Sequence, residues 1–252
     1  MSYIEMNIYS EALGKQTEVI VIMPQLDRSG EIGIESKSQP GPYKCLYLLH
    51  GLTDDHTIWM RRTAIERYAS AYGICVVMPN ADRSFYSDMK YGKAYYTYIA
   101  KELPAIMREY FNISTKQEDT YIAGLSMGGY GALKVGLRER GRYAACAGLS
   151  PCADVKNLPQ FAGTFRPIWG DEIAIPDEDD LLYLCRQAKD DANRPRVYIG
   201  IGTEDYLYDN TQTLCKKLRE YDYDFTYRES SGAHGWGFWD EYIQYVLKWM
   251  FG

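Results

Sequence analysis

Long uncharged hydrophobic runs, basic runs and an export leader are all missing from this sequence of 252 residues. No stretch approaches the roughly 18 apolar residues that mark a membrane-spanning helix. The first residues, MSYIEMNIYSEALGKQ, lack a basic segment followed by an apolar one. The 28 Lys and Arg residues are scattered and the formal net charge is -6, so a phosphate-binding surface is not indicated. We therefore expect a cytoplasmic protein that binds neither membranes nor nucleic acid.

Cysteine and histidine are also scarce. Several of the six cysteines lie inside apolar runs, and no CxxC motif or Cys/His cluster with metal-ligand spacing occurs. We expect reduced, mostly buried thiols, no metal site and no organic cofactor. Only His50, His56 and His234 can supply an imidazole base.

Five short apolar runs predict buried strands, at 45–51, 74–80, 120–126, 144–150 and 196–202. Each is continuously apolar and not alternating, which is typical of parallel strands covered on both faces. Helical patterns separate the runs, and 46% hydrophobic residues suit a single α/β domain over 1–252. We predict a doubly wound, mostly parallel sheet with helices on both faces and an antiparallel edge strand at 16–25.

Two segments carry the clearest helical spacing. Within 95–111, apolar residues recur at i, i+3 and i+4, although Pro104 is expected to kink or interrupt the helix. The same spacing runs from Trp239 to Met250 and predicts a C-terminal helix that packs on the sheet.

The region from about 151 to 195 breaks the alternation of strands and helices. It contains prolines, acidic residues and a predicted short helix at 181–190. Its large apolar side chains are Phe161, Phe165, Ile168 and Trp169. We expect a lid-like insertion over the strand ends, whose aromatic side chains either overhang a pocket or form a small satellite core.

The segment TYIAGLSMGGYGALK places one serine among four glycines directly after an apolar run. Gly124, Ser126 and Gly128 form the pattern GxSxG, in which small neighbours permit a sharp turn from strand to helix. Such a turn presents the serine hydroxyl at the carboxyl end of the sheet. We predict that Ser126 is a nucleophile and that Met127 N–H faces the developing oxyanion.

A serine nucleophile needs a base from a neighbouring loop. His234, in RESSGAHGWGFW, is the sole histidine after Ser126, which fits the chain order serine, acid, histidine. The orienting acid is expected after the strand at 196–202, in GTEDYLYDN. We choose Asp205 at the strand-to-loop junction, with Glu204 as the alternative.

The second oxyanion donor is expected in the loop after the strand at 45–51. The segment LYLLHGLTDDHTIW predicts Leu52 N–H, or alternatively Gly51 N–H, in that role. The side chains expected around the substrate are His56, Trp59, Cys152, Phe165, Trp169 and Trp236. Trp59 also fits the apolar face of a helix, and core packing is the favoured alternative for it.

The segments LLHGLTDDHTIWMRRTAIERYA, YIAGLSMGGYGALK, GTEDYLY and GAHGW together resemble the tributyrin esterase and esterase D group of α/β-hydrolases. That group also contains S-formylglutathione hydrolases, feruloyl and acetylxylan esterases and mycolyltransferases. The resemblance spans almost the whole chain and implies an α/β-hydrolase fold and a serine carboxylesterase without cofactor. It implies Ser126, Asp205 and His234 as the triad and the amides of Leu52 and Met127 as the oxyanion hole.

The loop reads HGLTDD where S-formylglutathione hydrolases carry a cysteine soon after GLT, so the resemblance favours oxygen esters over thioesters. We expect a small-molecule ester with a short acyl group, acetyl to butyryl, and sugar esters are among the candidates. The alternatives are a feruloyl esterase acting on soluble feruloylated oligosaccharides, an acyltransferase, and a non-catalytic binding protein. An exposed edge strand or the aromatic insertion leaves a homo-oligomer open.

Overall fold

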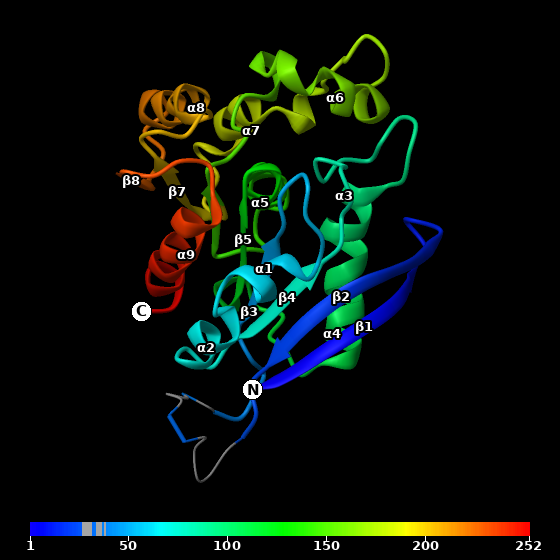
Figure 1. Ribbon diagram of the computed structural model, residues 1–252, viewed down its shortest axis with the longest axis vertical. Helices are drawn as coiled ribbons and strands as arrows, with labels where there is room; N and C mark the ends of the chain where they lie inside the picture. Colours follow the sequence, from blue (N-terminus) through cyan, green and yellow to red (C-terminus); the bar gives the residue numbers. More distant parts are fainter. Residues whose placement is uncertain (27–31, 34–36, 38) are drawn as a thin grey trace.

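The computed structural model of the protein describes residues 1–26, 32–33, 37 and 39–252. In this part of the chain, eight strands form one sheet in the order β1-β2-β4-β3-β5-β6-β7-β8 (Figure 1). The strands are β1 (Ser2–Ser10), β2 (Lys15–Met23), β3 (Cys45–Leu49), β4 (Cys75–Pro79), β5 (Thr120–Leu125), β6 (Ala145–Leu149), β7 (Arg196–Gly202) and β8 (Phe225–Ser230). The pairs from β4 to β8 are parallel, whereas β1 with β2 and β2 with β4 are antiparallel. The predicted mostly parallel sheet is confirmed.

Helices cover both faces of this sheet. They are α1 (Ile58–Arg62), α2 (Ile65–Ser70), α3 (Tyr95–Thr97), α4 (Leu103–Tyr110), α5 (Met127–Arg138), α6 (Ala162–Trp169), α7 (Leu181–Ala188), α8 (Tyr208–Glu220) and α9 (Trp236–Phe251). One core cluster joins the sheet to α4, α5, α7 and α8, and a second joins its other face to α1, α2 and α9. Neighbouring residues of β4, such as Val76 and Val77, belong to different clusters. Because both faces are covered, every residue of β4 is buried, which explains its continuously apolar sequence.

The expectation for the N-terminal edge of the sheet is wrong in one respect. The strand predicted at 16–25 corresponds to β2 and is antiparallel, but β1 pairs with its outer side and forms the edge. Along β1, residues from Ser2 alternate between partly buried and exposed up to Asn7. That alternation is typical of an antiparallel strand with one solvated face.

The helical segment predicted at 95–111 changes its pitch near Pro104. α3 continues into a π-helix at Tyr98–Glu102, and α4 follows with Pro104 in its first turn. Proline has no N–H, so it cannot donate to the carbonyl of Ala100 four residues earlier. The guanidinium of Arg142 donates to that carbonyl instead. The predicted interruption therefore occurs, and a distant side chain satisfies the released acceptor.

The C-terminal helix α9 follows the predicted spacing. Trp239, Tyr242 and Val246 are among its buried residues. Trp249 is only partly buried, and the guanidinium of Arg196 covers its ring at 4.5 Å from the centroid. Within the described residues, no helix combines the length and the hydrophobicity needed to cross a bilayer.

Residues 151–195 connect β6 to β7 and lie at the end of the molecule where the parallel strands finish (Figure 1). They form α6, α7 and short 3-10 turns. α7 falls within the helix predicted at 181–190, and the Asp180 carboxylate caps it by accepting from the amides of Leu182 and Tyr183. The break in the sequence pattern therefore coincides with a long connection between two neighbouring strands.

All six cysteines are free and buried, and this state is chemically testable. Burial raises the pKa of Cys152 and Cys215 to about 12 and holds that of Cys146 and Cys185 above its ordinary value. Because thiolate is the reactive form, these thiols are almost unreactive at pH 8. We predict that DTNB modifies no thiol of the native protein within minutes at pH 8 and all six after unfolding in guanidinium chloride. Rapid reaction of the folded protein would contradict the buried positions.

Candidate active site

Ser126 connects β5 to α5 as a single residue in an unusual backbone conformation. β5 ends at Leu125 and α5 begins at Met127. Ser126 has φ 53° and ψ -116°, a region that residues with a side chain rarely adopt. Three backbone hydrogen bonds hold it there: its N–H donates to Leu149 O at 2.8 Å, and its C=O accepts from the N–H of Tyr130 at 3.0 Å and of Cys152 at 3.4 Å.

The glycines of the GxSxG pattern are required by close approach of the backbone. A Cβ at residue 128 would lie 2.5 Å from the carbonyl oxygens of both Leu49 and His50, at the end of β3. A Cβ at residue 124 would collide with the carbonyl oxygen of Gly128. Only glycine therefore lets the first turn of α5 lie against β3 and β5 at once.

Three predicted side chains meet at this turn. The imidazole of His234 contacts Ser126 Oγ through Nε2 at 3.0 Å, and its Nδ1 lies 2.9 and 3.0 Å from the two carboxylate oxygens of Asp205. The Asp205 side chain is fully buried and also accepts from Leu207 N–H at 2.8 Å. A carboxylate only accepts, so it selects the tautomer with a proton on Nδ1 and leaves the Nε2 lone pair facing the serine hydroxyl.

Glu204, the alternative acid, has a different set of contacts. Its exposed carboxylate accepts from Gly232 N–H and lies 3.3 Å from Ser231 Oγ. The hydrogen bond from Gly232 lowers the pKa of Glu204. Glu204 therefore binds the loop that carries His234, while Asp205 contacts the imidazole itself.

Aromatic rings enclose the imidazole. The ring of Tyr206 lies 4.6 Å from that of His234, and Trp239 meets it edge to face at 4.9 Å. Trp239 is fixed in turn because its indole N–H donates to Ser150 Oγ at 3.1 Å. Sequence reasoning missed Tyr206 and treated Trp239 as core only, although Tyr206 directly follows the predicted acid.

The two predicted oxyanion amides belong to residues that follow the carboxyl ends of the neighbouring strands β5 and β3. Met127 is the first residue of α5, and the first N–H groups of a helix have no intrahelical acceptor. Leu52 lies in the loop after β3, and in the part of the chain that the structure describes its N–H donates to no protein acceptor. The alternative donor, Gly51 N–H, is occupied by the carboxylate of Asp54 at 3.2 Å. Leu52 is therefore the better candidate.

A cavity of about 390 Å³ opens beside Ser126. Two of the six predicted pocket residues, Cys152 and Trp236, line it. The other lining side chains are those of Leu52, Thr53, Asp54, Phe85, Leu125, Phe161, Tyr206, His234 and Trp239. The loop residue Phe85 belongs to no motif, so the sequence carried no signal for it.

Four residues that we expected at the pocket do not line it. His56 lies in the loop before α1. Trp59 is buried behind Trp236, with its indole N–H bonded to Leu49 O at 3.0 Å, so the core-packing alternative describes it. Phe165 and Trp169 are buried in the main core cluster, where their rings contact Phe85, which does line the cavity.

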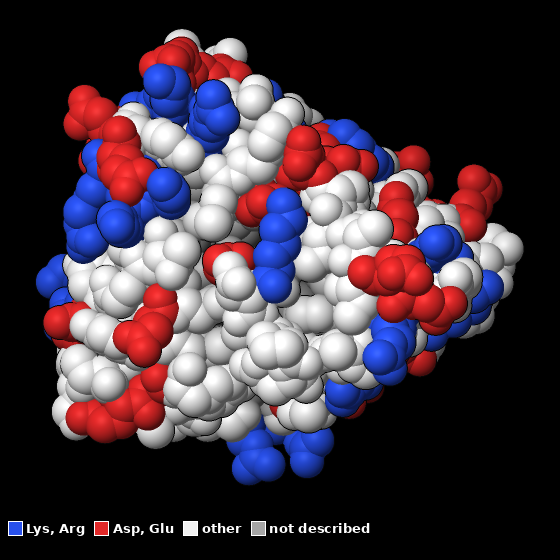
Figure 2. Space-filling model, turned by 90° about the horizontal axis from the view of Figure 1, so that it is seen from above, with Lys and Arg blue, Asp and Glu red and all other residues white. Residues whose placement is uncertain are grey.

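A wider and more polar cleft of about 650 Å³ adjoins this cavity, and the two share Leu52, Thr53 and Asp54. The side chains that line the rest of the cleft are Asp82, Arg83, Met89, Lys93 and Tyr95. Figure 2 shows the molecule from this end, with acidic and basic side chains beside one another, also near the middle of the face, and uncharged areas between them. The combined cavity therefore has an aromatic part at the serine and a part rich in hydrogen-bonding groups beyond the loop.

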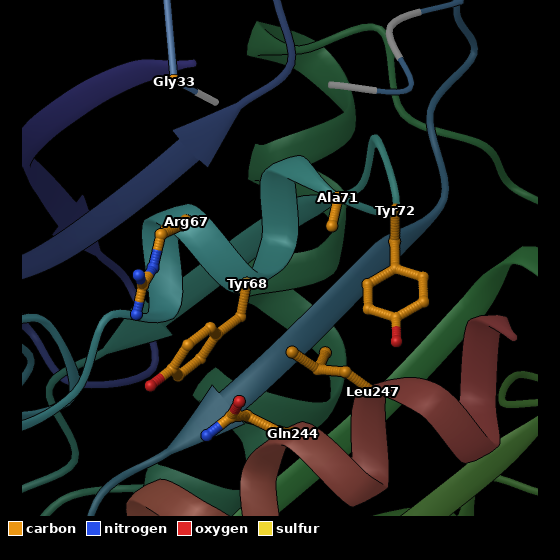
Figure 3. Close-up of a pocket in the computed structure, with 7 residues that line it drawn as sticks. All are labelled: Gly33, Arg67, Tyr68, Ala71, Tyr72, Gln244 and Leu247. Atoms are coloured by element: carbon orange, nitrogen blue, oxygen red, sulfur yellow. The ribbon is translucent and has the colours of Figure 1, made fainter. Parts of the chain in front are cut away.

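A separate cavity of about 420 Å³ lies between α2 and α9 (Figure 3). Arg67, Tyr68, Tyr72, Gln244 and Leu247 are among the residues that line it, and it contains none of the predicted site residues. Among the described residues, no group of three or more His, Cys, Asp or Glu side chains is arranged to hold a metal ion.

The known proteins to which this chain is similar are esterases and serine hydrolases. The model of the esterase family, described as "Putative esterase", matches residues 10–249. A curated relative, "Acetyl esterase" from Caldicellulosiruptor saccharolyticus, is 29% identical over 265 residues, which covers 99% of this chain and 98% of the relative.

Two solved structures from Staphylococcus aureus are similar over the full chain. The fluorophosphonate-binding serine hydrolase FphF, solved with substrate bound, has a TM-score of 0.90 and 34% identity and covers 100% of this chain and 98% of its own. The S-formylglutathione hydrolase FrmB has a TM-score of 0.87 and 33% identity, with 100% and 99% covered.

The glycine requirement at residue 128 predicts a difference between two single-methyl variants. Gly128→Ala forces a methyl group against two backbone carbonyls, and we expect it to lower the free energy of unfolding by about 1–3 kcal/mol. The matched control is Gly163→Ala in α6, where nothing lies within 4 Å and stability should be equal or higher. Thermal unfolding of both variants measures the difference. Equal melting temperatures would contradict the close approach of α5 to β3.

Proposed function

Because the chain belongs to the esterase family of α/β-hydrolases, we propose that it cleaves short-chain esters, acetyl to butyryl, through an acyl-enzyme on Ser126. The family makes the protein a carboxylic ester hydrolase of the serine hydrolase class. The observation that carries the assignment to these residues is the unbroken contact from Ser126 through His234 to Asp205.

The proposed reaction consists of two acyl transfers. His234 Nε2 takes the hydroxyl proton while Ser126 Oγ bonds to the ester carbonyl carbon, and Asp205 stabilises the imidazolium that forms. The bond between that carbon and the alcohol oxygen then breaks, and the imidazolium protonates the departing alkoxide. Water repeats the sequence on the acyl-enzyme and releases the carboxylic acid.

The amides of Leu52 and Met127 are the proposed donors to the oxyanion. Both are backbone groups, so they need no reorganisation when negative charge develops on the carbonyl oxygen. α5 begins at Met127, so the partial positive charge at the N-terminal end of this helix lies beside the Met127 amide. Loss of one such donor typically reduces the rate by roughly 100- to 1,000-fold.

Acetyl and other short acyl groups are the proposed substrates. The relative over nearly the whole chain is named an acetyl esterase, which supports a small acyl group. A cavity of about 390 Å³ lies at the small end of ligand sites. The adjoining cleft, with Asp82, Arg83 and Tyr95, offers both donors and acceptors and suits a hydroxyl-rich alcohol such as a sugar.

One observation favours a second candidate. Phe85, Phe161, Tyr206, Trp236 and Trp239 line the cavity, and an aromatic acyl group such as feruloyl would stack on such rings. Transfer of the acyl group to an alcohol in place of water would use the same acyl-enzyme.

Residues 151–195 are proposed to act as a cover over one end of the cavity. Phe161, in the turn before α6, supports this role because it lines the cavity from that segment. Cys152, near the start of the segment and shortly after β6, also lines the cavity.

Labelling with a fluorophosphonate tests the nucleophile directly. We expect one adduct on the wild type and none on Ser126→Ala, because only an activated serine attacks the phosphorus. Asp205→Asn should fold and lose roughly 10,000-fold in kcat, as expected when the tautomer is wrong. Intact-mass spectrometry detects the adduct, and steady-state kinetics measure kcat. An adduct on folded Ser126→Ala would refute the assignment.

A panel of p-nitrophenyl esters tests the substrate class. Acetate and butyrate should give the highest kcat/KM, with octanoate and ferulate much lower, because the cavity is small. The opposite order, with ferulate preferred, would replace the short-chain proposal by the feruloyl one. Added methanol that yields methyl ester faster than free acid would instead favour acyl transfer.

A further inference from the structure

The loop that carries Phe85 has two consecutive residues in a strained conformation. Phe85 has φ 48° and Tyr86 has φ 52°, in the left-handed region that bulky side chains avoid. Such a conformation persists only when its surroundings fix it. Tyr86 is held at both ends, because its N–H donates to Ser84 Oγ at 3.0 Å and its hydroxyl donates to His50 O at 2.9 Å.

A buried ammonium group holds the same loop from the other side. Lys134 on α5 has no exposed surface, and its three donors reach Phe85 O at 3.1 Å, Ser87 Oγ at 2.6 Å and Asp179 Oδ1 at 2.9 Å. All three N–H bonds of the ammonium therefore have partners. Lys134 lies on the helix that begins next to Ser126, so it connects the serine helix directly to the loop.

Asp179 extends this connection into the 151–195 segment. Its second carboxylate oxygen accepts from the indole N–H of Trp169 at 2.7 Å, and its carbonyl accepts from Tyr130 OH at 2.6 Å. Burial lowers the pKa of Lys134, and the Asp179 charge opposes that effect. The ion pair thus fixes α5, the Phe85 loop and the insertion relative to one another.

The rings around Phe85 show what this connection positions. Phe85 contacts Phe165 edge to face at 5.0 Å and lies 6.2 Å from Phe161 and from Trp169. Phe85 and Phe161 line the cavity at Ser126, while Phe165 and Trp169 do not. Phe85 is completely buried, so it belongs to the packed wall of the cavity and has no surface exposed to solvent.

The chemistry assigns this wall to the acyl group. The tetrahedral carbon carries Ser126 Oγ, the oxyanion, the alcohol oxygen and the acyl chain. The oxyanion faces the amides, and the alcohol oxygen must lie beside His234, which protonates it. Tyr206 and Trp236 flank that side. The acyl chain takes the remaining direction, where Phe85 and Phe161 form the wall.

We propose that Phe85 sets the upper limit on acyl chain length and that Lys134, through its ion pair with Asp179, is the positioning residue that holds Phe85 at that limit. The proposal rests on the esterase function proposed above and goes beyond it by assigning the selectivity to a wall outside the triad.

Acyl-chain selectivity of Phe85 variants tests the first part. The readout is the ratio of kcat/KM for p-nitrophenyl octanoate to that for the acetate. Phe85→Gly also removes the backbone strain and should raise the ratio by roughly tenfold or more, because methylene groups gain a place to bind. Phe85→Leu is a milder change that should raise it less. An unchanged ratio in folded variants would overturn the proposal.

Neutralisation of the ion pair tests the second part. Lys134→Met alone leaves the buried Asp179 carboxylate with only the longer contact from Arg138 Nη1 at 3.4 Å and endangers folding, so Asp179→Asn is combined with it. The double variant should raise the octanoate-to-acetate ratio toward that of Phe85→Gly. A lower melting temperature with an unchanged ratio would mean that the pair is only structural and would overturn the positioning role.

The matched control is Lys101→Met. This variant removes the ion pair between Lys101 and Glu139, which lies at the C-terminal end of α5 and does not line the cavity. Lys101 Nζ lies 2.6 Å from Glu139 and is half exposed, and its loss should leave the ratio unchanged. Fluorophosphonate labelling of each variant keeps the two proposals apart. If even the wild type takes no label, the proposed function fails, whereas full labelling with unaltered selectivity refutes only the role of Phe85 and Lys134.

Discussion

The first turn of α5 lies directly on the carboxyl end of β3. This close approach is possible because residue 128 is glycine and has no Cβ, whereas a Cβ there would lie 2.5 Å from two backbone oxygens. This contact brings the N–H of Met127 and the loop with Leu52 to the same end of the sheet. It also leaves Ser126 in a conformation that its three backbone hydrogen bonds must maintain. The hydroxyl, the amides and the cavity all depend on this one approach of backbone to backbone.

A second close approach brings the acid and the base to that hydroxyl. A Cβ at residue 202 would collide with the carbonyl of Gly232, so the end of β7 and the loop after β8 touch through their backbones. Glu204 reinforces this contact through the amide of Gly232. The adjacent Asp205 then lies within reach of His234, and its burial and the N–H of Leu207 fix the carboxylate for that contact.

The ion pair between Lys134 and Asp179 places charge where the core is otherwise apolar. Two buried charges lose hydration, and their attraction offsets that loss only when the remaining hydrogen-bonding groups are also satisfied. Here the ammonium has three acceptors, and the carboxylate accepts from Trp169 as well. Left-handed torsions cost roughly 1–2 kcal/mol per residue, and the Lys134 contact to Phe85 O helps to hold two of them in one loop.

The sequence by itself determined the parallel strands, the serine turn and the order of serine, acid and histidine, because these follow from local patterns of apolar residues, glycine and chain order. It also marked the long connection at 151–195 by the loss of that pattern. Only the tertiary structure decided which aromatic rings face Ser126. Phe85 and Phe161 line the cavity and Phe165 and Trp169 do not, because loops and the insertion meet through contacts between residues far apart in the chain. Periodicity indicates which side of one element is buried, and it carries no information on which ring of a shared cluster lines the cavity.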